Sequence, residues 1–205
     1  IGWLGKLVCG SSDPSRMQAD GLLDPSEVLA LAAARACLFR IRYGLHLVAQ
    51  RAEDRLLFDH QRQLATLLGY RDERADNLGV EQCMQAYYRA VRCVAAINSE
   101  LLVLCDERLN PQQNDVVALG NGLLRVGDGL DVEPGCSLHQ DPKALVALFA
   151  ELASGNGVRR LRANALRQLR LALDDPQLDF NHPDVLVEVR NIFLRGAAAV
   201  DALAA

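Results

Sequence analysis

A long helical pattern in the middle of the chain constrains the fold more than any other feature. From residue 80 to residue 109, apolar side chains recur at alternating steps of three and four residues, which predicts one continuous helix. At 1.5 Å per residue this helix would be about 45 Å long, enough for the spine of a helical bundle. Asn98 in its seam either fixes the packing register through a buried hydrogen bond or lies partly exposed toward one end. The predicted seam is Val80, Met84, Tyr87, Val91, Val94, Asn98, Leu101 and Cys105.

Two shorter helices are predicted before this spine. Asp24-Pro25-Ser26-Glu27 combines an N-cap acid, a proline at the first helical position and a glutamate three residues after the cap. A helix should therefore begin there and run to about residue 50. A second helix should run from about residue 55 to residue 68, where Gly69 would end it. The apolar stripe of the first is Leu31, Ala34, Leu38, Ile41, Leu45 and Val48.

The pattern changes after the spine. Val116–Leu119, a Gly120-Asn121-Gly122 turn and Leu123–Val126 predict a short β-hairpin within residues 114–138, which must pack on helices to be stable. Helices are expected again from Asp141-Pro142, over residues 158–173 and from near Asn181-His182-Pro183, and the alanine-rich stretch 196–205 should be a fraying helix end.

These elements predict a mainly α chain, a bundle of five to seven helices with one small β-hairpin insertion. We expect one helical domain over residues 1–205, with core helices in 24–109, the hairpin in 114–138 and the C-terminal helices in 141–205. The absence of an initiating methionine suggests a fragment of a larger multidomain protein.

Composition narrows the class of partner. A net charge of −4 argues against a nucleic-acid-binding protein, which needs a basic surface. No apolar run reaches the roughly 20 residues that cross a bilayer, so no membrane partner is expected. The six cysteines lack Cys-x-x-Cys spacing and fit reduced thiols, so we expect a cytoplasmic protein.

No catalytic, cofactor-binding or metal-binding residue is predicted. Gly10-Ser11-Ser12 resembles the opening of a nucleotidyltransferase site, but no Asp-x-Asp pair follows to hold Mg²⁺. The glycines at 120, 122, 127 and 129 have no Lys-Ser/Thr after them and fit turns better than a phosphate loop. The histidines are scattered without metal-ligand spacing.

A basic helix is the first of two charged features left open. It carries Arg159, Arg160, Arg162, Arg167 and Arg170, and could grip an acidic partner. We favour the alternative, a solvated face with ion pairs.

The second charged feature is a polar cluster of Arg42, His46, Arg55 and Asp59. These residues flank an apolar stripe, so half-buried charges there need partners. We favour an internal network in which Asp59 pairs with Arg42 or Arg55. The alternative is a polar surface that faces another domain.

The same stretch carries a family resemblance. Arg40-Ile41-Arg42-x-x-Leu45-His46, followed by Arg55-Leu56-Leu57-Phe58-Asp59-x-Gln61, resembles the signature of the bacterial PII-protein uridylyltransferase/uridylyl-removing enzymes. The likeness covers most of Trp3 to Arg195 and is strongest over residues 35–105.

The resemblance implies the helical middle domain of a bifunctional enzyme of nitrogen regulation. In that family a nucleotidyltransferase domain precedes this region, and an HD phosphohydrolase domain and glutamine-sensing ACT domains follow it. The parent would use Mg²⁺ and UTP, with PII as its substrate, while this stretch would support the nucleotidyltransferase domain and be inactive alone. No catalytic residue of the family has a matching position here. The alternative function is an independent helical protein-interaction or ligand-binding module.

Overall fold

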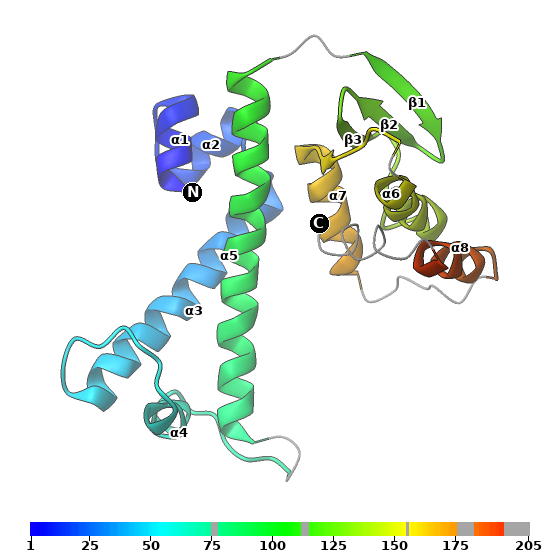
Figure 1. The fold of residues 1–205 in the computed structure, drawn as a ribbon. Coiled ribbons are helices and arrows are strands. Elements are labelled where there is room, and N and C mark those ends of the chain that lie inside the picture. The colour runs from blue at the N-terminus through cyan, green and yellow to red at the C-terminus, as the bar shows by residue number, and fades with distance from the viewer. Residues whose placement is uncertain (75–77, 112–114, 155, 176–182, 195–205) are drawn as a thin grey trace. The chain divides into compact units, whose positions relative to one another are not determined.

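The computed structural model describes residues 1–74, 78–111, 115–154, 156–175 and 183–194. These residues form eight helices and a small four-stranded sheet, so the prediction of a mainly α chain with a small β insertion is confirmed (Figure 1). The chain divides into two compact units, Ile1–Ser99 and Glu100–Ala205, which are described separately. In the described part, no helix is both long and apolar enough to span a membrane.

The first unit is helical. It contains α1 (Gly2–Cys9), α2 (Pro14–Ala19), α3 (Pro25–Ala49), α4 (Phe58–Leu67) and the first part of α5, a helix that runs from Gly79 to Leu109 (Figure 1). The helices α3, α4 and α5 were predicted, although α4 begins three residues later than expected. The short helices α1 and α2 were not predicted.

The start of α3 has the predicted capping box. The backbone N–H of Asp24 donates to Glu27 Oε2 at 2.8 Å, and the Asp24 side chain caps the backbone in return. Gly44, near the other end, allows α4 to approach, because a Cβ there would lie only 2.7 Å from Leu64 Cδ1. The capping box thus fixes the start of α3, and the close approach at Gly44 packs α4 against it.

Leu101 and Cys105 of the predicted seam are buried, but in the first unit the buried face of α5 differs from that seam. In the first unit this face runs through Cys83, Ala90 and Ile97, while Val91 of the predicted seam is 37% exposed. A shift by one residue turns the buried face by about 100° around the helix axis, but it leaves unchanged the steps of three and four residues that predict the helix. Asn98 is partly buried, and its Oδ1 accepts a hydrogen bond from the Ile1 nitrogen at 3.2 Å.

The second unit combines the end of α5 with a sheet and three helices. Its sheet has the order β1 (Val116–Gly120), β2 (Leu123–Val126), β3 (Gly129–Val132) and β4 (Arg160–Leu161). The helices are α6 (Pro142–Ser154), α7 (Ala163–Leu173) and α8 (Pro183–Leu194). The core lies between the sheet, α6 and α7, and comprises Leu123, Leu130, Val132, Leu138, Ala144, Leu145, Leu148, Val158, Leu161, Ala165 and Ala172.

The predicted hairpin is present and is extended by β3. The strands β1 and β2 pair antiparallel around a turn in which Asn121 has φ 53° and Gly122 has φ 72°, as a two-residue hairpin turn requires. Gly122 also packs directly against Cys136, so a side chain there would collide with the thiol.

The helix predicted over residues 158–173 is wrong at its start. Arg160–Leu161 instead pairs in parallel with Gly129 and Leu130 of β3, and the backbone N–H of Arg162 donates to Leu130 O at 2.9 Å. This pairing satisfies the backbone in an extended conformation, so the helix begins only at Ala163. The predictions for Asn181, His182 and the stretch 196–205 fall outside the described residues.

Candidate functional site

The predicted polar cluster lies at the end of α3 in the first unit, with a different acid as its centre. Arg42 donates from Nε to Asp54 Oδ1 at 2.8 Å and from Nη2 to Asp54 Oδ2 at 3.3 Å. Nε2 of His46 lies 3.5 Å from the same Oδ1. Arg42 and His46 are one helical turn apart, so both reach Asp54 in the loop after α3. We call Arg42, His46 and Asp54 the Asp54 cluster.

The predicted pairing of Asp59 with Arg42 or Arg55 is wrong. Asp59 is exposed in the first turn of α4 and has no ion-pair partner within the described ranges. Arg55 is also exposed, and within the described ranges its hydrogen bonds are backbone ones: its N–H donates to Glu53 Oε1 at 3.0 Å, and its carbonyl accepts from the Leu57 N–H at 2.9 Å. The physical reason is the loop between the helices. Gln50 ends α3 with φ 53°, and α4 begins only at Phe58, so the loop presents Asp54 to Arg42.

The cluster is open to solvent instead of buried. The side chains of Arg42 and Asp54 are 52% and 68% exposed. Hydrogen bonds from Arg42 and then His46 hold the pKa of the Asp54 carboxyl below its usual value. The backbone N–H of Arg55, and then the Arg51 guanidinium, lower the pKa of Glu53 as well. Both acids are therefore ionised at neutral pH, and the cluster presents paired charges on a surface.

An apolar row lies on the same helix and was missed by the sequence analysis. Phe39, Tyr43 and Leu47 follow one another at four-residue intervals and are 38%, 64% and 69% exposed. The rings of Phe39 and Tyr43 stack with centroids 6.2 Å apart, and His46 meets Tyr43 edge-on at 6.3 Å. We call these three residues the α3 row. Their regular four-residue spacing was the available signal, but α3 also carries a longer apolar stripe that is buried or half-buried, and the spacing alone does not separate the two.

A groove opens beside the α3 row, also within the first unit. It has a volume of about 480 Å³, and its lining from α3 and α5 includes Leu31, Leu38 and Val94. Two arginines, Arg35 and Arg42, also line the groove. The Arg35 guanidinium lies 5.2 Å from the centroid of the Phe39 ring, and Arg35 has no carboxylate partner in the part of the chain that the structure describes.

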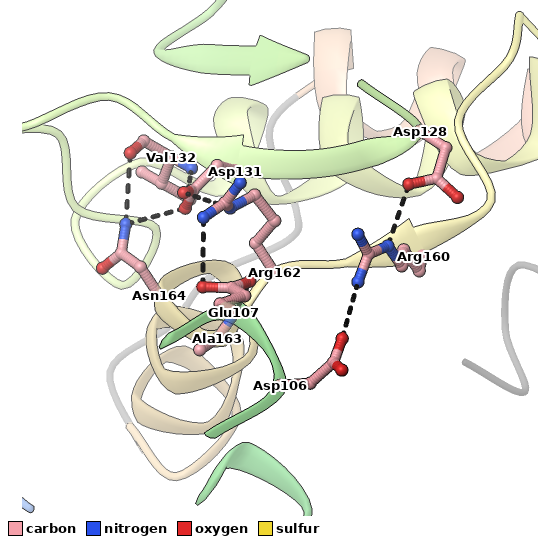
Figure 2. Close-up of polar contacts among 9 residues, drawn as sticks. All are labelled: Asp106, Glu107, Asp128, Asp131, Val132, Arg160, Arg162, Ala163 and Asn164. Atoms are coloured by element: carbon pink, nitrogen blue, oxygen red, sulfur yellow. Dashed lines mark hydrogen bonds and ion pairs between the residues drawn. The ribbon is translucent and has the colours of Figure 1, made fainter. Parts of the chain in front are cut away.

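The arginines of the predicted basic helix lie partly before α7, with Arg160 in β4 and Arg162 at the N-cap, and three of the five form ion pairs within the second unit. Figure 2 shows Arg160 between two acids, with Nε 2.9 Å from Asp128 Oδ1 and Nη1 3.8 Å from Asp106 Oδ2. Hydrogen bonding to Asp128 raises the pKa of Arg160, and the same contact lowers the pKa of Asp128. Arg160 is 41% exposed.

The ion pairs of Arg162 are more buried than those of Arg160. Its Nη2 lies 3.1 Å from Glu107 Oε2 and its Nε lies 3.3 Å from Asp131 Oδ2, as Figure 2 shows. The contact with Asp131 is an ion pair but not a hydrogen bond. Among the described residues, the buried Nε of Arg162 has no hydrogen-bond acceptor. Asp131 also accepts from Asn164 Nδ2 at 3.0 Å.

Arg170 completes the set of internal pairs. Its Nε donates to Glu100 Oε1 at 2.6 Å and its Nη2 to Oε2 at 3.2 Å, and the Glu100 side chain is only 6% exposed. The expected ion pairs are thus present and lie between elements of the second unit. The pairs of Arg160 are solvent-exposed, whereas those of Arg162 and Arg170 are largely buried and not on a solvated face. Three arginines that could have gripped an outside acid are engaged within the fold.

All six cysteines are free thiols. Over the described ranges, no group of three or more His, Cys, Asp and Glu side chains is placed to hold a metal ion.

Comparison with known proteins identifies the family. A family model described as GlnD PII-uridylyltransferase matches residues 1–102. A bifunctional uridylyltransferase/uridylyl-removing enzyme of Pseudomonas aeruginosa (strain LESB58) is 33% identical over 193 residues, covering 91% of this chain and 21% of that protein. The enzyme of the same name from Azotobacter vinelandii (strain DJ) is 38% identical over 170 residues, covering 82% of this chain and 19% of that protein. The chain belongs to the PII-uridylyltransferase family.

The residues that the family model matches include the candidate site. Residues 1–102 include all of the first unit, and therefore the Asp54 cluster, the α3 row and the groove. The chain spans about a fifth of the length of the curated PII-uridylyltransferase relatives it matches. No solved structure matches it.

Proposed function

We propose that this chain is the helical middle region of a bifunctional enzyme that adds uridylyl groups to PII and removes them. In this proposal it lies between the nucleotidyltransferase and HD domains of the parent and supports the nucleotidyltransferase domain without supplying catalytic groups. The parent would be a cytoplasmic enzyme of nitrogen regulation that senses glutamine. Mg²⁺ and UTP would bind to the nucleotidyltransferase domain, and PII would be the substrate of the whole enzyme.

The observation that carries the proposal is the exposed α3 row beside the Asp54 cluster. Soluble monomers rarely expose contiguous large apolar side chains, and patches rimmed by polar groups mark interaction sites. Aromatic residues and arginine are the types enriched at protein interfaces. Tyr43 is 64% exposed, follows Arg42 directly and lies about one turn from His46 on the same helix.

The length of the relatives supports a partner within the same polypeptide. The matched stretch is 21% of the Pseudomonas aeruginosa protein, so most of that protein lies outside it. Another domain of the parent could cover the α3 row permanently. Such a domain interface within one chain is typically 600–1,500 Å² and mixes apolar with polar contacts. The open Asp54 cluster would supply the polar part.

The test is the exchange of Tyr43 for serine in the full-length parent enzyme. Tyr43→Ser should lower the rate of uridylyl transfer to PII about tenfold, as expected for an interface aromatic worth about 1.4 kcal/mol. The same exchange in the 205-residue chain should change its free energy of unfolding by less than about 0.5 kcal/mol, since the side chain is exposed. Leu173→Ser, at a 62% exposed position of α7, is the matched control and should keep full activity. Full activity of Tyr43→Ser would contradict the proposal.

A further inference from the structure

We propose that the groove beside the α3 row binds an amphipathic helix of the parent chain that carries a carboxylate opposite Arg35. This inference rests on the proposed function, because it takes the partner from the same polypeptide. It adds the chemistry of the contact and places that contact in the groove. The groove and the α3 row are separate surfaces that share only Phe39.

The lining of the groove favours apolar side chains. Leu31, Leu38 and Val94 line its walls, and a volume of about 480 Å³ is in the range of sites that bury a large part of a ligand. An apolar groove left in water is unfavourable in proportion to the apolar surface that it exposes. An occupant with a row of apolar side chains would remove that cost.

Arg35 indicates the charge of the occupant. Its guanidinium rests over the Phe39 ring at 5.2 Å, and in the described part of the chain no carboxylate pairs with it. Arg42, the other arginine of the groove, already holds Asp54. Arg35 is therefore the group that an incoming carboxylate would meet, and such a pair at the edge of an apolar contact sets orientation more than affinity.

The secondary structure of the first unit favours a helical occupant. The groove is lined by residues of α1, α2, α3 and α5 and of the segment between α1 and α2, and none of its lining residues belongs to a strand. An extended segment would find no strand edge to pair with there, whereas a helix satisfies its own backbone and presents apolar residues at i, i+3 or i+4, and i+7.

Photo-cross-linking in the full-length parent enzyme tests this contact. Leu31→p-benzoyl-phenylalanine places the photoreactive ring in the groove, and Leu29→p-benzoyl-phenylalanine is the matched control, because Leu29 lies on the same helix, is 72% exposed and does not line the groove. Mass spectrometry should map the cross-link from position 31 to an amphipathic helix of the same polypeptide that contains an acid. Position 29 should give no such product.

A charge reversal separates the carboxylate from the apolar contact. Arg35→Glu should lower the cross-link yield at position 31 about fivefold, corresponding to about 1 kcal/mol for a rim ion pair, and Arg35→Lys should keep most of it. Arg89→Glu, an exposed arginine of α5, is the control for net charge and should leave the yield unchanged.

Several results would overturn the inference. A cross-link between two copies, seen as a dimer mass, would make the groove a self-association surface. Equal yields at positions 29 and 31, or no cross-link at position 31, would show that no segment occupies it. A cross-link yield at position 31 that Arg35→Glu does not change would show that no carboxylate of the occupant pairs with Arg35. This test can fail separately from the proposed function. If Tyr43→Ser loses activity but position 31 gives no cross-link, the α3 row remains an interface and only the binding of a helix in the groove is rejected.

Discussion

The Nη2 of Arg162 lies 3.1 Å from Glu107 Oε2, while its Nε lies 3.3 Å from Asp131 Oδ2, so one guanidinium joins the end of α5 to β3. All three side chains are less than a quarter exposed. This geometry makes the arginine a structural tie of the second unit and leaves it unavailable to an outside anion.

Removal of Arg162 should destabilise the second unit. Arg162→Met leaves Glu107 and Asp131 largely buried without their cation, and we expect a loss of about 3 kcal/mol in the free energy of unfolding. Arg160→Met is the matched control, because Arg160 and its partners are 41–58% exposed, and it should cost less than about 1 kcal/mol. Urea unfolding of the 205-residue chain measures both. Equal losses for the two variants would contradict the structural role of Arg162.

The Glu100–Arg170 pair allows a double-mutant cycle. Glu100→Leu and Arg170→Met each break this ion pair and should each cost about 3 kcal/mol, since the carboxylate is almost fully buried. Glu100→Leu combined with Arg170→Met replaces the pair by apolar groups and should recover most of that loss. Additive losses in urea unfolding would mean that the two side chains do not act as a pair.

Asp128 should give stability that depends on pH. The hydrogen bond from Arg160 lowers its pKa in the folded chain, so its contribution is present above the unfolded pKa of about 4 and is lost as pH falls through the lower, folded value. The contact is solvent-exposed, which limits the effect to less than about 1 kcal/mol. Asp128→Asn should therefore be slightly less stable than the parent chain at pH 7, and the difference should vanish at pH 2 to 3 in thermal unfolding. A difference that grows toward acid pH would reverse the sign and refute the pairing.

Much of the fold was predictable because it depends on local patterns. The step pattern from Val80 to Cys105 predicted α5, and the Asp24 capping box predicted the start of α3. The same cap-plus-proline signal at Asp13-Pro14 begins α2, but a helix of six residues is too short to show an apolar period. Local signals therefore recover long helices and overlook short ones.

The remainder depends on contacts that sequence order does not contain. The strand β4 is only two residues long and exists because β3 accepts it as a parallel neighbour about 30 residues away. The Arg42–Asp54 pair depends on the left-handed conformation of Gln50, which directs the loop back toward α3. The site residues Arg42 and His46 were found from the sequence, whereas Asp54 and the α3 row were not.

The central claim is that this region supports a catalytic domain without supplying catalytic groups. An assay of the 205-residue chain alone, with PII, UTP and Mg²⁺, tests it most directly, with the full-length parent enzyme as the positive control and cooperative thermal unfolding as the check that the chain is folded. We predict that the parent transfers UMP to PII and that the folded chain neither transfers it nor removes it from uridylylated PII, because the proposed function assigns the groups for both reactions to other domains. Turnover by the chain alone, in either direction, would contradict the account.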